Sequence, residues 1–274
     1  MTAVLLAAPA TAQHDHHAGE HGQDPAAKVQ KISVPTSLVP QTTCPISGED
    51  LEDKENFIDY EGHRIYVCCK KCKKKAAMMP EQVAMKMFAA GIALENKQTT
   101  CPVSGEELED HDTFVKLYNK TIYTCCNKCK TKVAANPAKY LDLMEGRTAQ
   151  TKCAVRGGDL DPEANFIVEG MTIGQCCPGC EKKWQADPAT YFAKLKAEKV
   201  VVEPATMICP VMPGMNGNKK FPVTLGAKRY YLCSEKAALM FVSNQEKYMP
   251  GWFAAQGIEH APRLDEHKGD HDVQ

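Results

Sequence analysis

The sequence is poor in aromatic residues and in long apolar runs. Only two Trp and eight Phe occur among the 274 residues, so aromatic side chains supply little of any core. No stretch approaches the roughly 18 apolar residues of a membrane-spanning helix, so we expect no transmembrane segment. The formal net charge of −1 gives no general attraction to nucleic acid or anionic lipid, and we expect no nucleic-acid partner.

Cysteine, in contrast, is abundant and regularly spaced. Four times a cysteine is followed about 24 residues later by a second cysteine or a cysteine cluster, and successive first cysteines are 57, 52 and 56 residues apart. All fourteen cysteines belong to this repeat: Cys44, Cys68, Cys69, Cys72, Cys101, Cys125, Cys126, Cys129, Cys153, Cys176, Cys177, Cys180, Cys209 and Cys233. Thiols that return in register with the same Pro and Gly neighbours indicate a role of the sulfur rather than of packing.

The repeat predicts four modules. We place module 1 at residues 41–95, module 2 at 98–147, module 3 at 150–200 and a degenerate module 4 at 205–260. Units of about 50 residues bury too little apolar surface to offset chain entropy, and natural ones add a metal or disulfides. The sulfur clusters are therefore expected to stabilise the fold as well as to carry the function of the protein.

The two ends of the chain differ in composition from the modules. Residues 1–12 are Ala-rich and end in Ala10-Thr11-Ala12, which predicts a cleaved signal peptide and export to a periplasmic or extracellular space. Residues 13–40 are expected to be a disordered, His-rich linker, and residues 261–274 a disordered, His-containing tail.

Module 1 illustrates the expected local structure. Cys44-Pro45-Ile46-Ser47-Gly48 has the form of a tight knuckle, in which Gly allows a positive φ. Residues 57–68 contain two β-rich runs about Gly62, which indicates a hairpin. A helix follows the cluster, and Pro80, Pro137 and Pro188 each stand eight residues after the last cysteine of their module. Asn136-Pro137 and Asp187-Pro188 are each an N-cap followed by Pro at the first position of a second helix. Each module is thus predicted to be a knuckle, a hairpin and two short helices, an α+β arrangement.

The combined pattern resembles the YHS domain, of the TRASH group of treble-clef-like, metal-binding modules. The shared features are Cys-Pro-[Ile/Val]-x-Gly, a hairpin that ends in Tyr-x-Cys, a further cysteine four residues on, and a helix with Asn-Pro-x-x-Tyr. The resemblance covers modules 1 and 2 fully, module 3 well and module 4 in part. It implies a tandem array of treble-clef-like modules that bind Zn²⁺ or Cu⁺ through cysteine thiolates.

The resemblance also implies which cysteines act together. One triad is expected in each of modules 1 to 3: Cys44, Cys68 and Cys72; Cys101, Cys125 and Cys129; Cys153, Cys176 and Cys180. Cys69, Cys126 and Cys177 are extra thiols, because a serine is usual at that place, as Ser234 is in module 4. The family's second knuckle cysteine is replaced by Ser47, Ser104, Arg156 and Met212, so the fourth ligand of a closed zinc site is unassigned unless the extra thiol serves. A three-sulfur site would suit Cu⁺ as well.

Module 4 departs furthest from this pattern. Ala237 stands where the third cysteine should be, which leaves Cys209 and Cys233. Met207, Met212 and Met215 lie near Cys209 in sequence. We favour the interpretation that these methionines fill gaps in a small core, the alternative being a copper-type variant of the site.

Two other interpretations compete with metal binding. An exported protein would meet an oxidising environment, in which cysteines pair as structural disulfides. Each module has an even number of cysteines, four in modules 1 to 3 and two in module 4, so all of them could pair. The Cys-x-x-Cys spacing could also serve a thiol–disulfide oxidoreductase, but such enzymes need a βαβ setting rather than a hairpin. His63 and His111 are expected at the surface, and no catalytic set stands out elsewhere. We predict a non-enzymatic metal binder for metal handling, delivery or detoxification, with a metal-transport or metal-resistance protein as partner.

Overall fold

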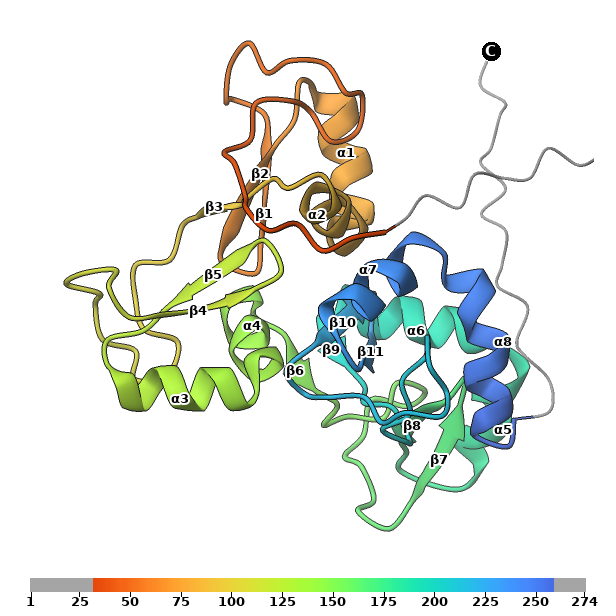
Figure 1. Ribbon diagram of the computed structural model, residues 1–274. Coiled ribbons are helices and arrows are strands. Elements are labelled where there is room, and N and C mark those ends of the chain that lie inside the picture. Colours follow the sequence, from red (N-terminus) through yellow and green to blue (C-terminus); the bar gives the residue numbers. More distant parts are fainter. Residues whose placement is uncertain (1–31, 259–274) are drawn as a thin grey trace, which may run out of the picture. The chain divides into compact units, whose positions relative to one another are not determined.

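Each of the four modules consists of a β-hairpin followed by two helices, as the computed structural model shows (Figure 1). The structure describes residues 32–258. The hairpins are β1–β2 (Phe57–Tyr60, His63–Tyr66), β4–β5 (Phe114–Leu117, Lys120–Tyr123), β7–β8 (Asn165–Val168, Met171–Gly174) and β10–β11 (Pro222–Leu225, Lys228–Tyr231). The first helices are α1 (Lys70–Met78), α3 (Asn127–Ala135), α5 (Gly179–Ala186) and α7 (Glu235–Ser243), and the second helices are α2 (Pro80–Ala89), α4 (Pro137–Glu145), α6 (Pro188–Ala197) and α8 (Gln245–Ala255). The predicted hairpins and helices are confirmed.

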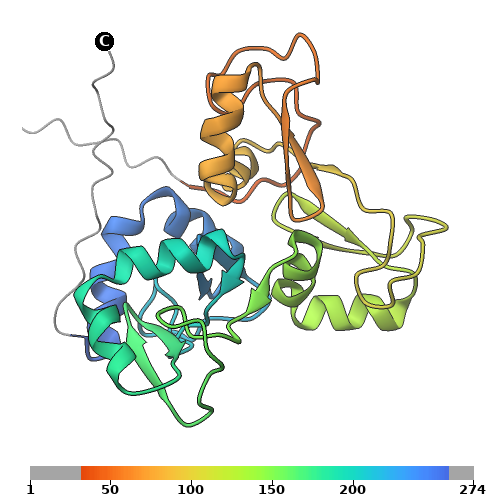
Figure 2. The same cartoon turned by 180° about the vertical axis from the view of Figure 1, so that it is seen from behind.

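The hairpins are antiparallel and closed by tight turns. In module 1 Tyr60 pairs with His63, so Glu61 and Gly62 form the turn, and both have a positive φ, of 50° and 74°. This is the backbone conformation of the turns that suit the right-handed twist of two-stranded hairpins. Figure 2 shows the hairpin of module 1 beside α1 and α2 from the opposite side.

The second helices begin where the sequence predicts. Pro80, Pro137 and Pro188 are the first residues of α2, α4 and α6, a position at which proline removes no helical hydrogen bond. The Asp187 side chain accepts a hydrogen bond from the backbone N–H of Thr190, 3.1 Å away. Asn136 makes no such bond, so only one of these two expected side-chain caps forms.

Short pairings join neighbouring parts of the chain. Strand β3 (Glu95–Asn96) adds to β2, and β6 (Thr148–Ala149) pairs in parallel with β9 (Val200–Val201). Near the end of the predicted linker, Val39 pairs in parallel with Ile92. The predicted signal peptide, residues 13–31 of the linker and the tail at 261–274 lie outside the described residues. Within residues 32–258 no helix is long and apolar enough to cross a bilayer.

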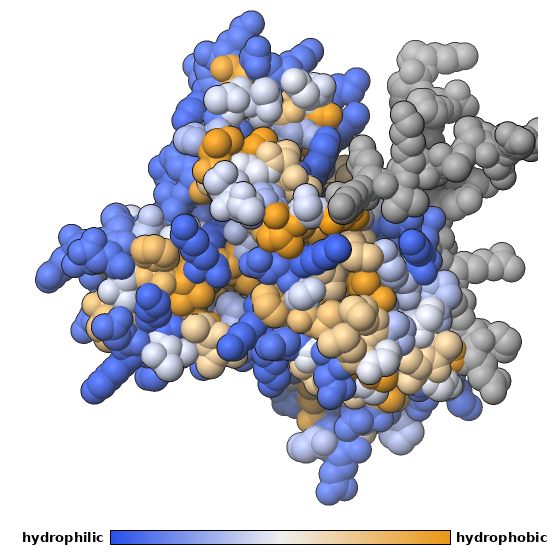
Figure 3. Space-filling view, in the orientation of Figure 1, coloured by the Kyte–Doolittle hydropathy of each residue, from blue (hydrophilic) through white to orange (hydrophobic). Residues whose placement is uncertain are grey.

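The hydrophobic core is not confined to single modules. Module 1 has a cluster of its own, which includes Ile65, Val67 and Met87. A larger cluster joins side chains of all four modules, from Phe88 through Ile122 and Trp184 to Trp252. Figure 3 shows hydrophilic side chains over the outer ends of one face, with apolar ones between them. The modules therefore supplement their small cores by packing against one another.

A buried group of charged side chains connects modules 1, 2 and 4. We call it the buried ion cluster; its members are Glu61, Glu81, Lys120, Asp142, Arg147 and Arg229. Lys120 on β5 binds Glu61 of the first hairpin turn and lies 3.1 Å from Glu81 of α2. Burial opposes ionisation of Glu61, but Lys120 and Arg147 outweigh it and hold its pKa well below the usual range. No local sequence pattern predicts this cluster, because its members come from three modules.

His63 is fully buried, so the prediction that it lies at the surface is wrong. Its Nδ1 lies 2.7 Å from the carbonyl oxygen of Glu61, and its Nε2 accepts a hydrogen bond from the backbone N–H of Thr121 at 3.0 Å. Burial, aided by the charge of Lys120, lowers its pKa. The imidazole is thus a neutral link between the first two hairpins. His111 is exposed as expected and lies against the Tyr123 ring.

Candidate metal centres

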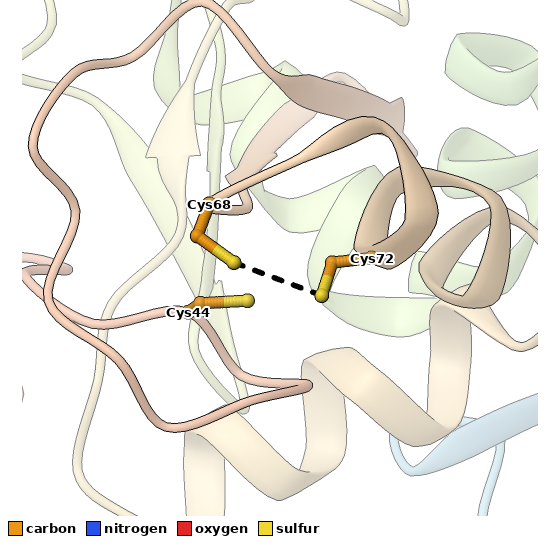
Figure 4. A group of neighbouring side chains, drawn as sticks. All are labelled: Cys44, Cys68 and Cys72. Atoms are coloured by element: carbon orange, nitrogen blue, oxygen red, sulfur yellow. Dashed lines mark hydrogen bonds between the residues drawn. The ribbon is translucent and has the colours of Figure 1, made fainter.

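Three thiols converge in module 1 from both ends of the hairpin (Figure 4). Cys44 comes from the knuckle before β1, Cys68 from the segment after β2, and Cys72 from the first turn of α1. The three Sγ atoms all lie within 4.8 Å of one another, and those of Cys68 and Cys72 are 3.7 Å apart. Cys44 and Cys72 are buried, and Cys68 is partly exposed.

The same arrangement recurs in the next two modules. Cys101, Cys125 and Cys129 form the second group, and Cys153, Cys176 and Cys180 form the third, again within 4.8 Å. The Sγ atoms of Cys125 and Cys129 are 3.7 Å apart. In module 3, Cys180 Sγ lies 3.6 Å from Cys153 Sγ and 3.8 Å from Cys176 Sγ. Repeated spacing in sequence therefore produces repeated convergence in space.

The sulfur separations match those of a thiolate-bound ion. A Zn–S bond of about 2.3 Å in a tetrahedral site places neighbouring sulfurs about 3.8 Å apart. A disulfide, by contrast, requires about 2.05 Å. All fourteen cysteines lie in the described residues and are free, with no pair at the bonding distance of a disulfide. The groups have the spacing of a site that could hold a metal ion, and the alternative of disulfide staples has no support in this geometry.

The knuckle orients the leading thiol by backbone hydrogen bonds. The N–H of Cys44 donates to the carbonyl of Glu49 at 2.7 Å, and the N–H of Gly48 donates to the carbonyl of Cys44 at 2.8 Å. Gly48 has a φ of 83°, as the Cys-Pro-x-x-Gly pattern predicts. The Ser47 hydroxyl lies 3.4 Å from Cys68 Sγ, and Ser104 lies at the same distance from Cys125 Sγ. The residue three positions after the leading cysteine thus faces the first cysteine of the cluster.

The leading thiols are the most acidic of the groups. Burial alone would raise the pKa of Cys44, but hydrogen bonds from Ser47 and from backbone N–H groups lower it to about 6. Hydrogen bonds likewise outweigh burial and lower the pKa of Cys101 to about 6 and that of Cys153 to about 7. In modules 1 to 3 the leading thiol is therefore easier to ionise than an ordinary cysteine, and the thiolate is the form that binds metal.

In modules 2 and 3 the thiol on the helix is the least acidic of the triad. Burial and the neighbouring cysteines raise the pKa of Cys129 and that of Cys180 to about 12. A second negative charge beside the leading thiolate is unfavourable unless a cation arrives. Metal binding at such a site deprotonates the remaining thiols and releases protons.

The extra thiols do not all occupy equivalent places. Cys69 and Cys126 are exposed N-cap residues of α1 and α3 and stand outside the triads. Cys177 differs, because α5 begins later, at Gly179, and Cys177 Sγ lies 3.5 Å from Cys180 Sγ. In module 3 the extra thiol thus lies beside the helix thiol, although the atoms that all lie within 4.8 Å of one another are only those of Cys153, Cys176 and Cys180.

Module 4 brings only two cysteines together. Cys209 and Cys233 have their Sγ atoms 3.4 Å apart, and Ala237 occupies the place of the third thiol. Met212 and Met215 are about half exposed, so the prediction that these methionines fill a small core is wrong for both. Around the first two groups the lysines of α1 and α3 are exposed, in line with the predicted solvated helix faces.

No protein-family description, curated protein or solved structure matches this chain. The fold and the sites alone therefore define its class. The chain is a mixed α/β protein with repeated cysteine-rich units, and its clusters are consistent with a metal-binding repeat.

Proposed function

We propose that this chain binds several thiophilic metal ions, Zn²⁺ or Cu⁺, through the three cysteine triads. The observation that supports this most strongly is that in three modules the Sγ atom of the knuckle cysteine lies within 4.8 Å of two Sγ atoms of the cluster. Three independent groups with the spacing of a thiolate-bound ion are hard to explain by packing, because a buried cysteine that only fills space needs no partner sulfur.

The finer parts of the proposal are supported by the sequence. The modules are of the treble-clef-like YHS type, and the protein is exported and handles, delivers or detoxifies metal together with a transport or resistance protein. Residues 10–12 provide the support for export through their Ala-x-Ala signature. No catalytic role is proposed for the thiols.

Metal uptake by the purified, reduced protein tests the proposal. We expect about one zinc ion per triad, three in all, measured by competition with a chromophoric zinc chelator and by native mass spectrometry. Replacing Cys72, Cys129 and Cys180 by Ser in one chain should remove most of this stoichiometry, because each triad loses its helix ligand. Unchanged uptake would reject the triads.

The chain offers a matched control for this experiment. Cys69→Ser and Cys126→Ser remove two exposed thiols outside the triads, and serine suits an N-cap, as Ser234 shows in module 4 by accepting from the N–H of Ala237 at 3.2 Å. The double variant should keep all three ions. Alkylation with and without prior reduction adds a second control, since native thiols that react only after reduction would favour the disulfide alternative.

A further inference from the structure

Three sulfur atoms meet in module 4 in a combination that the other modules lack. Cys233 Sγ lies 3.4 Å from Cys209 Sγ and 3.8 Å from Met212 Sδ. Cys209 is buried, Cys233 is partly exposed, and Met212 is 48 % exposed. The thioether therefore extends the thiol pair towards solvent instead of filling the core.

The knuckle of module 4 holds Met212 in this place. The N–H of Cys209 donates to the carbonyl of Met215 at 2.9 Å, and the N–H of Met215 donates to the carbonyl of Met212 at 2.8 Å. The indole N–H of Trp252 fixes the start of the turn by donating to the carbonyl of Ile208 at 2.9 Å. These bonds close the turn over the thiol pair.

The position of Met212 corresponds to that of a serine in modules 1 and 2. It stands three residues after the leading cysteine, as Ser47 and Ser104 do, and each of the three faces the first cysteine of its cluster. Module 4 lacks the helix thiol, since Ala237 stands at its place, but it has a sulfur in the knuckle, that of Met212. The number of sulfur donors is thereby restored to that of a triad, with a different chemical character.

We propose that Cys209, Cys233 and Met212 form a fourth site that binds a soft monovalent cation, Cu⁺ or Ag⁺, in preference to Zn²⁺. A thioether is a soft, neutral donor that suits Cu⁺, whereas structural zinc sites take four ligands from Cys, His and carboxylates. Two thiolates and one thioether also carry less negative charge than a cysteine triad, which suits a monovalent ion better than a divalent one. This site extends the proposed metal binding to module 4. It rests on the proposed function in that the chain is taken to be a metal-binding protein, but it does not depend on the triads.

Methionine methyl NMR of the full, reduced chain tests this site directly. The protein is labelled with ¹³C at its methionine methyl groups, and the signal of Met212 is identified by its loss in Met212→Leu. Addition of Ag⁺ should shift the Met212 signal before that of Met78, which is more exposed at 63 % but belongs to none of the cysteine groups. Zn²⁺ should leave the Met212 signal unshifted.

Two variants complete the test. Cys233→Ser should abolish the Ag⁺-induced shift of Met212, because the thiolate that anchors the ion is lost. Met215→Leu, which alters a similarly exposed methionine of the same turn, should leave the shift intact.

The proposal is overturned if Met212 does not respond to Ag⁺, responds no earlier than Met78, or responds equally to Zn²⁺. If instead the triads do not bind zinc, the protein takes up no zinc but Met212 still responds to Ag⁺. If the module 4 site does not bind Ag⁺, the protein still takes up zinc but the Met212 signal does not shift with Ag⁺.

Discussion

Replacement of Lys120 by Met is expected to lower the free energy of unfolding by about 3–5 kcal/mol, because it removes one partner from a buried ion pair. Lys120 and Glu61 are each only 2 % exposed, and Lys120 also binds Glu81. The methionine fills a similar volume but leaves two carboxylates in the interior with less positive charge. Such a loss is a large fraction of the total stability of about 5–15 kcal/mol that is usual for a folded domain.

Urea unfolding of the metal-free, reduced protein at pH 7 measures this effect. Lys152→Met is the matched control, because Lys152 pairs with Asp159 at the surface, where both side chains are more than half exposed. The control should cost less than about 1 kcal/mol. If the two variants cost the same, the buried ion cluster does not hold the modules together.

Acid should produce a related loss in the unmodified protein. The pKa of Glu61 is lowered below its ordinary value of 4.5, so its contribution to stability is fully present above pH 4.5 and is lost as the pH falls towards the folded-state pKa. His63 also lowers the stability of the protein in acid. Its pKa in the folded protein is below the ordinary value of 6.5, so below pH 6.5 the unfolded chain binds a proton more readily than the folded chain does. Lys120→Met should lose less stability over the acid range than the unmodified chain, since part of the cause of the Glu61 shift is gone.

Removal of bound zinc by a chelator is expected to lower the free energy of unfolding by about 4 kcal/mol per site. The comparison is with protein in the presence of free zinc at about 1,000 times the dissociation constant. The reason is that each triad joins the knuckle to the helix across a hairpin, and the unfolded chain lacks this arrangement. Modules with small individual cores depend on such a link more than large domains do.

Urea unfolding with and without chelator measures this prediction. The chain with Ser at positions 72, 129 and 180 is the control, and its stability should hardly respond to the chelator. Hydrogen exchange adds local resolution, since the N–H groups of Cys44 and Gly48 should exchange faster once zinc is removed. Equal stability of the loaded and metal-free protein would contradict the structural role of the ion.

The local features of each module could be predicted from the sequence because they depend on neighbouring residues. Gly48 marked the knuckle, and Pro80 marked the start of α2. The repeated spacing indicated that a knuckle cysteine and the cluster meet across the hairpin, and the resemblance to the YHS domain implied the triad of Cys44, Cys68 and Cys72. In each case the residue type restricts the backbone or recurs at a fixed interval, so no knowledge of distant contacts was needed.

Contacts between modules could not be predicted in this way. Lys120 and Glu61 are 59 positions apart, and nothing in the sequence near either residue indicates an ion pair. The expectation that His63 lies at the surface fails for the same reason, because the second hairpin, 58 positions further along the chain, covers its ring. The exposure of Met212 could not be predicted either, because the contact of its sulfur with Cys233 depends on how the knuckle turn folds.

X-ray absorption at the zinc edge of the loaded protein tests the central claim most directly, since it counts the atoms bound to the ion. The account predicts three or more sulfur ligands per zinc at about 2.3 Å, with fewer sulfurs when Cys44, Cys101 and Cys153 are replaced by Ser. A coordination shell made only of nitrogen and oxygen, or one that is unchanged in this variant, would contradict it.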